Sequence, residues 1–124
     1  MIKVTVLYNL PVGTDEAEFL RWRTGEHNAA NIARPGVVQA DFYRVVGTPL
    51  LGPDQPAGDR APYRFITESY WPDLASFRAS WEEPEEQARL LPAVAKITDA
   101  LFLVSEEVQT FVAQDAGESE APER

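Results

Sequence analysis

Four short segments rich in β-branched and aromatic residues, interrupted by helical stretches, constrain the fold of this chain more than any other feature. The predicted strands cover residues 2–9, 36–47, 63–71 and 100–112. Their order with the helices is βαββαβ, which is the order of a ferredoxin-like α+β fold. We therefore predict a four-stranded antiparallel sheet with both helices packed on one of its faces.

The first helix is expected to begin at Thr14, a suitable N-cap residue. It should end before Pro35, because the residue before a proline is pushed out of the helical region. Phe19 lies on its apolar, core-facing side. His27, the only histidine of the chain, is predicted near the C-terminal end of this helix, one turn after Arg23. From there the imidazole can turn inward toward the sheet.

A second helical stretch is predicted from Pro72 and Asp73 onward, since these residues suit the start of a helix. A short helix should follow and break near Pro92. Residues 48–62, between the second and third strands, are rich in proline and glycine and predict a long loop. Because this loop joins two strands that are expected to be central, we expect it to border the mouth of a pocket.

The second predicted strand, residues 36–47, is apolar on both faces over most of its length. Such a pattern indicates burial on both sides of the sheet. The helices cover only one face, and the chain has no further element to cover the other. A second copy of the chain can do so, and we therefore expect a homodimer whose two sheets pack face to face into a barrel-like core.

Composition excludes several classes of function. The net charge of −9, with scattered basic residues, argues against nucleic acid and against an anionic membrane surface. The chain has no cysteine and a single histidine, so we expect no metal site and no disulfide. No nucleotide-binding motif occurs, and we expect no cofactor. Without a signal peptide or an apolar stretch near the ~20 residues needed to span a membrane, a cytoplasmic protein is expected.

A single domain is expected over residues 1–112, because the chain is too short for two comfortable domains. Residues 113–124 are acidic and show no hydrophobic periodicity. They predict a disordered tail.

A series of segments in this order is similar to a known family: "MIKVTVLYNLP", an aromatic-rich helix ending in "EH", "PG", "FYRVVG" and "PYRFITESYWPDLASFRAS". Together they resemble the EthD-like family of dimeric α+β barrel proteins. The resemblance implies this fold and, among family members, cofactor-free isomerases, cyclases and related enzymes that act on small aromatic or polyketide-derived molecules. It also implies that His27 corresponds to a histidine that points into a cavity between sheet and helices. Ala40 stands where family members often carry a tyrosine, and "HNAAN" replaces a small residue and proline after the histidine.

Two hypotheses are open for each of the two polar residues on the first helix. His27 is either a partly exposed residue stabilised by the helix dipole, or a pocket imidazole that moves a proton near neutral pH. Arg23 either binds a carboxylate or enolate oxygen, or lies on the surface and pairs with Glu26 or Glu16.

We take His27 as the candidate catalytic residue. Strand and helix positions with aromatic or hydrogen-bonding side chains are the candidate substrate-binding residues, and they are Tyr8, Arg23, Phe42, Thr67, Ser69 and Trp71. Ser69 is not expected to act as a nucleophile, because no triad or nucleophile elbow surrounds it.

Three functions are compatible with these residues. The first is a cofactor-independent enzyme, such as an isomerase, cyclase or dehydratase, in which His27 moves a proton on a small carbonyl or aromatic substrate. The second is a non-catalytic protein that binds a small hydrophobic ligand, which the absence of a tyrosine at Ala40 favours. The third is a cofactor-free monooxygenase, supported by Trp22, Trp71 and Trp81.

Overall fold

A computed structural model describes residues 1–113 of the chain. The elements follow one another as β1 (Ile2–Asn9), α1 (Glu16–Thr24), α2 (Glu26–Ile32), β2 (Gln39–Arg44), β3 (Phe65–Trp71), α3 (Leu74–Trp81), α4 (Pro84–Val94) and β4 (Thr98–Glu106). This is the predicted ferredoxin-like α+β order, with a helix pair in place of each single helix. The predicted tail lies, apart from residue 113, outside the described residues.

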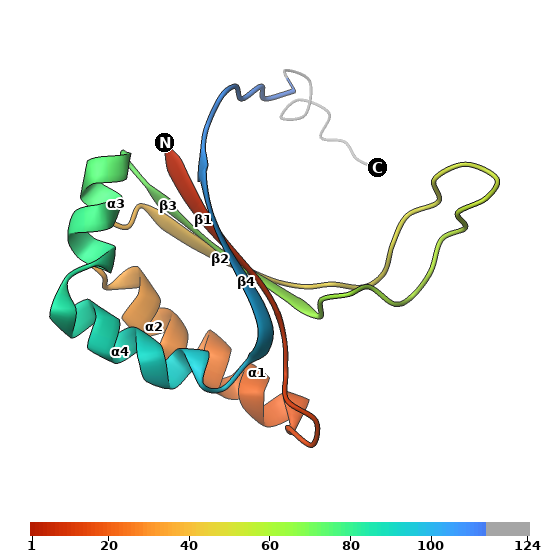
Figure 1. Cartoon of the computed structure of the whole chain (residues 1–124), viewed down its shortest axis with the longest axis horizontal. Helices are drawn as coiled ribbons and strands as arrows, with labels where there is room; N and C mark the ends of the chain where they lie inside the picture. Colours follow the sequence, from red (N-terminus) through yellow and green to blue (C-terminus); the bar gives the residue numbers. More distant parts are fainter. Residues whose placement is uncertain (114–124) are drawn as a thin grey trace.

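The sheet has four strands in the order β2-β3-β1-β4, and every neighbouring pair is antiparallel. All of the helices lie on one face of this sheet (Figure 1), as predicted. The opposite face is covered by no element in the part of the chain that the structure describes. The strand order makes β1 and β3 central, whereas β2 is an edge strand and not a central one.

Strict alternation along β1 builds the sheet side of the core. Every second side chain of this strand is buried, and the residues between them are half-buried. Phe65 and Trp71 of β3 are fully buried beside them. The buried apolar core consists of Ile2, Val4, Val6, Tyr8, Phe19, Phe65, Trp71 and Phe77. This core fixes the helices above the two central strands, where the site is found.

The first helical stretch differs from the prediction in two ways. Its N-cap is Asp15 and not Thr14, because the Asp15 carboxylate accepts from the backbone N–H groups of Ala17 and Glu18. The stretch is also divided at Gly25, where a Cβ atom would lie only 2.9 Å from the Arg21 carbonyl oxygen. His27 therefore lies in the first turn of α2, and not at the C-terminal end of one long helix.

Other element boundaries also needed correction. Asp73 caps α3 as predicted, but α4 runs unbroken through Pro92. Pro92 lies in the last turn of α4, where little of the helix remains to be disrupted, and the Ala95 N–H still bonds to the Leu91 carbonyl. The second strand covers only residues 39–44. No helix among the described residues is long and apolar enough to cross a membrane.

Candidate functional site

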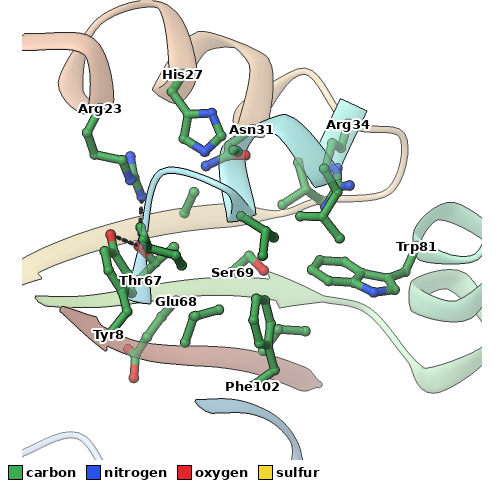
Figure 2. A pocket seen from close by; sticks show the side chains of 18 of the residues that line it. Tyr8, Arg23, His27, Asn31, Arg34, Thr67, Glu68, Ser69, Trp81 and Phe102 are labelled. Carbon is green, nitrogen blue, oxygen red and sulfur yellow. Dashed lines mark hydrogen bonds between the residues drawn. The ribbon is translucent and has the colours of Figure 1, made fainter. Parts of the chain in front are cut away.

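A cavity of about 90 Å³ lies between the helix-facing side of the sheet and the helices above it (Figure 2). Its floor is formed by β1 and β3, and its walls come from α1, α2 and α4, with Trp81 of α3 at one side. Most of the lining is apolar. Polar side chains enter it mainly from α1, α2 and the centre of β3, so the polar groups converge on one part of an otherwise apolar pocket.

His27 lies in the wall of this cavity. Its imidazole is half-buried and stacks on the indole of Trp22, with ring centroids 4.3 Å apart and an interplanar angle of 20°. Burial lowers the pKa of His27 to about 4, and the positive charges of Arg23, Arg34 and Lys96 add to this effect. The imidazole is therefore neutral at pH 7 and able to accept a proton or a hydrogen bond.

Arg23 is buried in the same cavity, with only 2% of the residue exposed. Its Nη2 donates to Thr67 Oγ1 at 3.2 Å, and Thr67 Oγ1 is in turn 3.0 Å from the Tyr8 hydroxyl. The guanidinium stacks over the ring of Phe42, with 4.4 Å between Cζ and the ring centroid. The prediction of a surface arginine paired with Glu26 or Glu16 is wrong. Glu16 pairs instead with Arg64, at 2.9 Å.

The central strand β3 supplies the polar floor next to these residues. Thr67 and Ser69 line the cavity together with Trp71, whose Nε1 donates to Ser69 Oγ at 3.1 Å. Ala40 is the cross-strand partner of Ser69 and also lines the cavity. No phenol hydroxyl is therefore present at the position where the family resemblance led us to look for one.

Six of the seven predicted site residues line the cavity, namely Tyr8, Arg23, His27, Thr67, Ser69 and Trp71. The seventh, Phe42, is not part of the lining and acts behind it, as the stacking partner of Arg23. Sequence analysis missed Asn31 and Arg34, which also reach the cavity. Asn31 could have been found from its spacing, because it follows His27 by four residues and therefore lies on the same helix face.

The long loop is not part of the site. Residues 48–62 contribute nothing to the cavity lining and project away from the helices (Figure 1), so the prediction that they border the pocket mouth is wrong. A pair of backbone hydrogen bonds between Thr48 and Gly58 closes this segment into an arm beyond the sheet. Within residues 1–113, no group of three or more acidic or histidine side chains is arranged to hold a metal ion.

Comparison with solved structures shows the same fold in other proteins. An EthD-family protein from Bacillus halodurans superposes with a TM-score of 0.69 at 22% identity, covering 87% of this chain and 99% of the other. A hydroxynitrile lyase from Passiflora edulis gives 0.63 at 17% identity, with 90% and 96% covered. A dimeric ferredoxin-like protein from Thermobifida fusca gives 0.59 at 16% identity, with 84% and 88% covered.

Comparison by sequence identifies the family of the chain. No curated protein sequence is significantly similar to the chain. The family model described as the EthD domain matches residues 12–101, which include α1, α2 and the whole of β2 and β3. The match covers most of the chain and contains His27, Arg23 and Thr67. The chain therefore belongs to the EthD domain family.

Proposed function

We propose that this protein is a cofactor-independent enzyme in which neutral His27 accepts a proton from a small carbonyl or aromatic molecule bound in the cavity. The observation that carries the proposal is the position of the only imidazole of the chain. It lines an apolar cavity, and burial and neighbouring cations lower its pKa to about 4. A neutral imidazole in such a place is a general base that is ready at neutral pH.

The low pKa of His27 restricts the reaction. A weak base removes a proton efficiently only from a carbon or oxygen acid that the substrate itself makes acidic, for example a carbon next to a carbonyl group. His27 is the only histidine in the chain, so no second imidazole can transfer a proton in the same reaction. The proposed reactions are therefore isomerisation, cyclisation, dehydration or lyase-type cleavage, all of which start with one proton transfer.

The cavity also limits the size of the bound group. Its volume of about 90 Å³ is smaller than the roughly 150 Å³ of an engineered apolar cavity that holds benzene. The enclosed space thus accepts a small molecule, or the reacting end of a longer molecule that extends past the half-buried rim. Apolar side chains around it exclude water from the reacting group and favour a hydrophobic or aromatic ligand.

Exchange of carbon-bound protons tests this function without knowledge of the natural substrate. Small ketones and aldehydes, including acetophenone and phenylacetaldehyde, are incubated with the protein in D2O, and deuterium uptake next to the carbonyl group is followed by NMR. Wild-type protein should accelerate uptake by about 10²–10⁴-fold for a compound that fits. His27→Asn should abolish this acceleration and still bind the compound.

The matched control is Asn28→Ala, which alters the neighbouring, exposed residue of the same helix. This variant should exchange protons at the wild-type rate. Acceleration that survives in His27→Asn would contradict the proposal. Binding without any acceleration in wild-type protein, for every compound in the panel, would instead favour a non-catalytic binding protein, which the absence of a tyrosine at Ala40 supports.

A cofactor-free monooxygenase is the second candidate, because all three tryptophans of the chain line the cavity. Their rings can hold an aromatic substrate by stacking, and that substrate itself would supply the electrons to oxygen. Oxygen consumption with hydroxylated aromatic compounds, measured with an oxygen electrode, separates this function from proton transfer, which consumes none.

The open face of the sheet supports the proposal of a homodimer. By strand register, Leu7, Ile66, Leu101 and Leu103 lie on the face that no helix covers. Leu101 and Leu103 are 41% and 43% exposed. Contiguous apolar side chains on a sheet face are typical of an interface, and a second copy offers the same surface in a two-fold arrangement. The face also carries the Lys3–Glu68 ion pair, at 3.4 Å, so it is less apolar than the second strand alone suggested.

A further inference from the structure

Two arginines of this protein are stacked on aromatic rings below the surface, and they differ in one respect. Arg34 stacks on Trp81, with 4.6 Å between Cζ and the ring centroid, and Arg23 stacks on Phe42 at 4.4 Å. The Arg34 Nε also binds the buried carboxylate of Glu86 at 3.1 Å. The positive charge of Arg34 is therefore balanced within the fold by the carboxylate of Glu86.

Arg23 lacks such a partner. No carboxylate lies within ion-pair distance of its guanidinium among residues 1–113, and its Nη1 atom is buried without a hydrogen-bond partner there. Its Nη2 donates to the neutral hydroxyl of Thr67, which is in turn 3.0 Å from the hydroxyl of Tyr8, and neither group carries a carboxylate. An unpaired buried charge is costly, since removing an ion from water costs several kcal/mol before any partner repays it.

Acidic residues near Arg23 on the helices, or next to Thr67 on β3, bind other partners or are exposed. Glu16 binds Arg64. Glu68 is among the residues that border the cavity, but its carboxylate points away from Arg23 (Figure 2) and binds Lys3. Glu26 is exposed on α2. The fold therefore keeps a guanidinium in the cavity wall with an unused donor, and it does so beside the candidate base.

We propose that the cavity binds a ligand that carries a carboxylate, and that this carboxylate pairs with Arg23. The inference deepens the proposed function, on which it rests, by naming the chemical class of the ligand. Arginine suits this role because its donors match a carboxylate and it stays charged inside a protein. The carboxylate then lies at the Thr67 and Tyr8 end of the cavity, and the apolar part of the ligand extends toward Trp22 and His27.

This arrangement couples the ligand to the base. The charge of Arg23 is one of the causes that lower the pKa of His27. A carboxylate bound to Arg23 offsets that charge, so the pKa of His27 rises when the ligand enters. His27 is then a stronger base with an anionic ligand in place than with a neutral one, so an anionic compound should react faster than a neutral compound of the same shape.

Binding of benzoate and benzamide tests the proposal, because the two probes have nearly the same shape and differ in charge. Affinities are measured at pH 7 by isothermal titration calorimetry on the full chain. Wild-type protein should bind benzoate more tightly than benzamide by about thirtyfold, as expected for a desolvated charge pair. Arg23→Gln should remove this preference, and Arg23→Lys should keep most of it.

The control is Arg21→Gln, which removes an exposed arginine of the same helix and should preserve the preference. Circular dichroism is used to check that each variant is folded. If Arg23→Gln does not fold, the charge-conserving Arg23→Lys still provides a comparison with wild-type protein. Equal binding of the two probes to wild-type protein, or an unchanged preference in Arg23→Gln, overturns the inference and leaves the small-molecule pocket in place. The inference is also overturned if wild-type protein binds neither probe. In contrast, failure of wild-type protein to show His27-dependent proton exchange contradicts the proposed function alone.

Discussion

Replacing Arg23 by methionine should stabilise the protein, because the substitution removes a charge that the free chain does not balance. Methionine fills a similar volume next to Phe42 and carries no group that needs a partner. The arginine loses several kcal/mol of hydration on burial. It recovers roughly 1.5–3 kcal/mol from the hydrogen bond to Thr67 and about 1–2 kcal/mol from stacking on Phe42.

The balance favours methionine by about 1–2 kcal/mol. For a chain of this length that difference raises the melting temperature by about 3–12 °C. Thermal unfolding followed by circular dichroism or calorimetry, in a buffer without carboxylates, measures the effect. The comparison variant is Arg34→Met, because Arg34 is stacked in the same way but binds Glu86.

Arg34→Met should destabilise the protein by about 2–4 kcal/mol, since it leaves the buried Glu86 with Arg89 as its only remaining partner. The two substitutions should therefore change the melting temperature in opposite directions, and this difference in direction is the test. If Arg23→Met lowers the melting temperature as much as Arg34→Met does, the charge of Arg23 is balanced within the fold. The reasoning that assigns its partner to a ligand is then refuted.

The remaining predictions concern His27, the open sheet face and the arm. The NMR signal of the single imidazole should titrate with a midpoint near pH 4, and Arg23→Gln should move that midpoint upward, whereas a wild-type midpoint near 6.5 would contradict the burial argument. Between pH 6.5 and 4 the unfolded chain holds more protons on His27 than the folded one, so stability should fall as the pH is lowered through this range. The loss should be about 1–2 kcal/mol after allowance for partial exposure, and it should be absent in His27→Gln. If the proposed homodimer forms, wild-type protein should show about twice 13.8 kDa in light scattering; Leu103→Asp should then give a monomer, while Val104→Asp, on the other face of the same strand, should not. Trypsin should cut first at Arg60 in the exposed arm, and protection of that bond in the isolated chain would contradict its exposure.

The fold could be predicted from the sequence because its strongest signals are local. Alternation along residues 2–9 and the β-rich third strand each depend on neighbouring residues, and they predicted that β1 and β3 exist. Which strands are central depends on tertiary pairing, and the expectation that the second strand is central was wrong. The cap at Asp73 is local as well. The break at Gly25 was missed because helical spacing continues across it, and only the close approach of the Arg21 carbonyl shows why a glycine stands there.

The sequence predicted which residues lie together at the candidate site, but it did not predict their charge pairing or their burial. Sequence spacing placed Arg23 and His27 on one helix stripe, and strand alternation placed Tyr8 and Thr67 on the inner face. Whether Arg23 is paired depends on where Glu16 and Glu68 point, which is decided by tertiary packing. The sign of the helix dipole at His27 also changed once the helix was found to divide, since a residue in a first turn has its pKa lowered and not raised.

Because all three indole rings border the cavity, the tryptophan fluorescence of this protein reports on the cavity. Trp22, Trp71 and Trp81 all border the same cavity, so the emission contains no contribution from a tryptophan elsewhere. Trp22 is in contact with the His27 ring on α2 and lies 4.9 Å from the ammonium group of Lys96. Its emission should respond to protonation of that imidazole, because a charged imidazole quenches an indole in contact with it. Entry of any compound should likewise change the polarity around the rings, so a large and chemically diverse collection can be screened without a label, a known substrate or an assay of turnover.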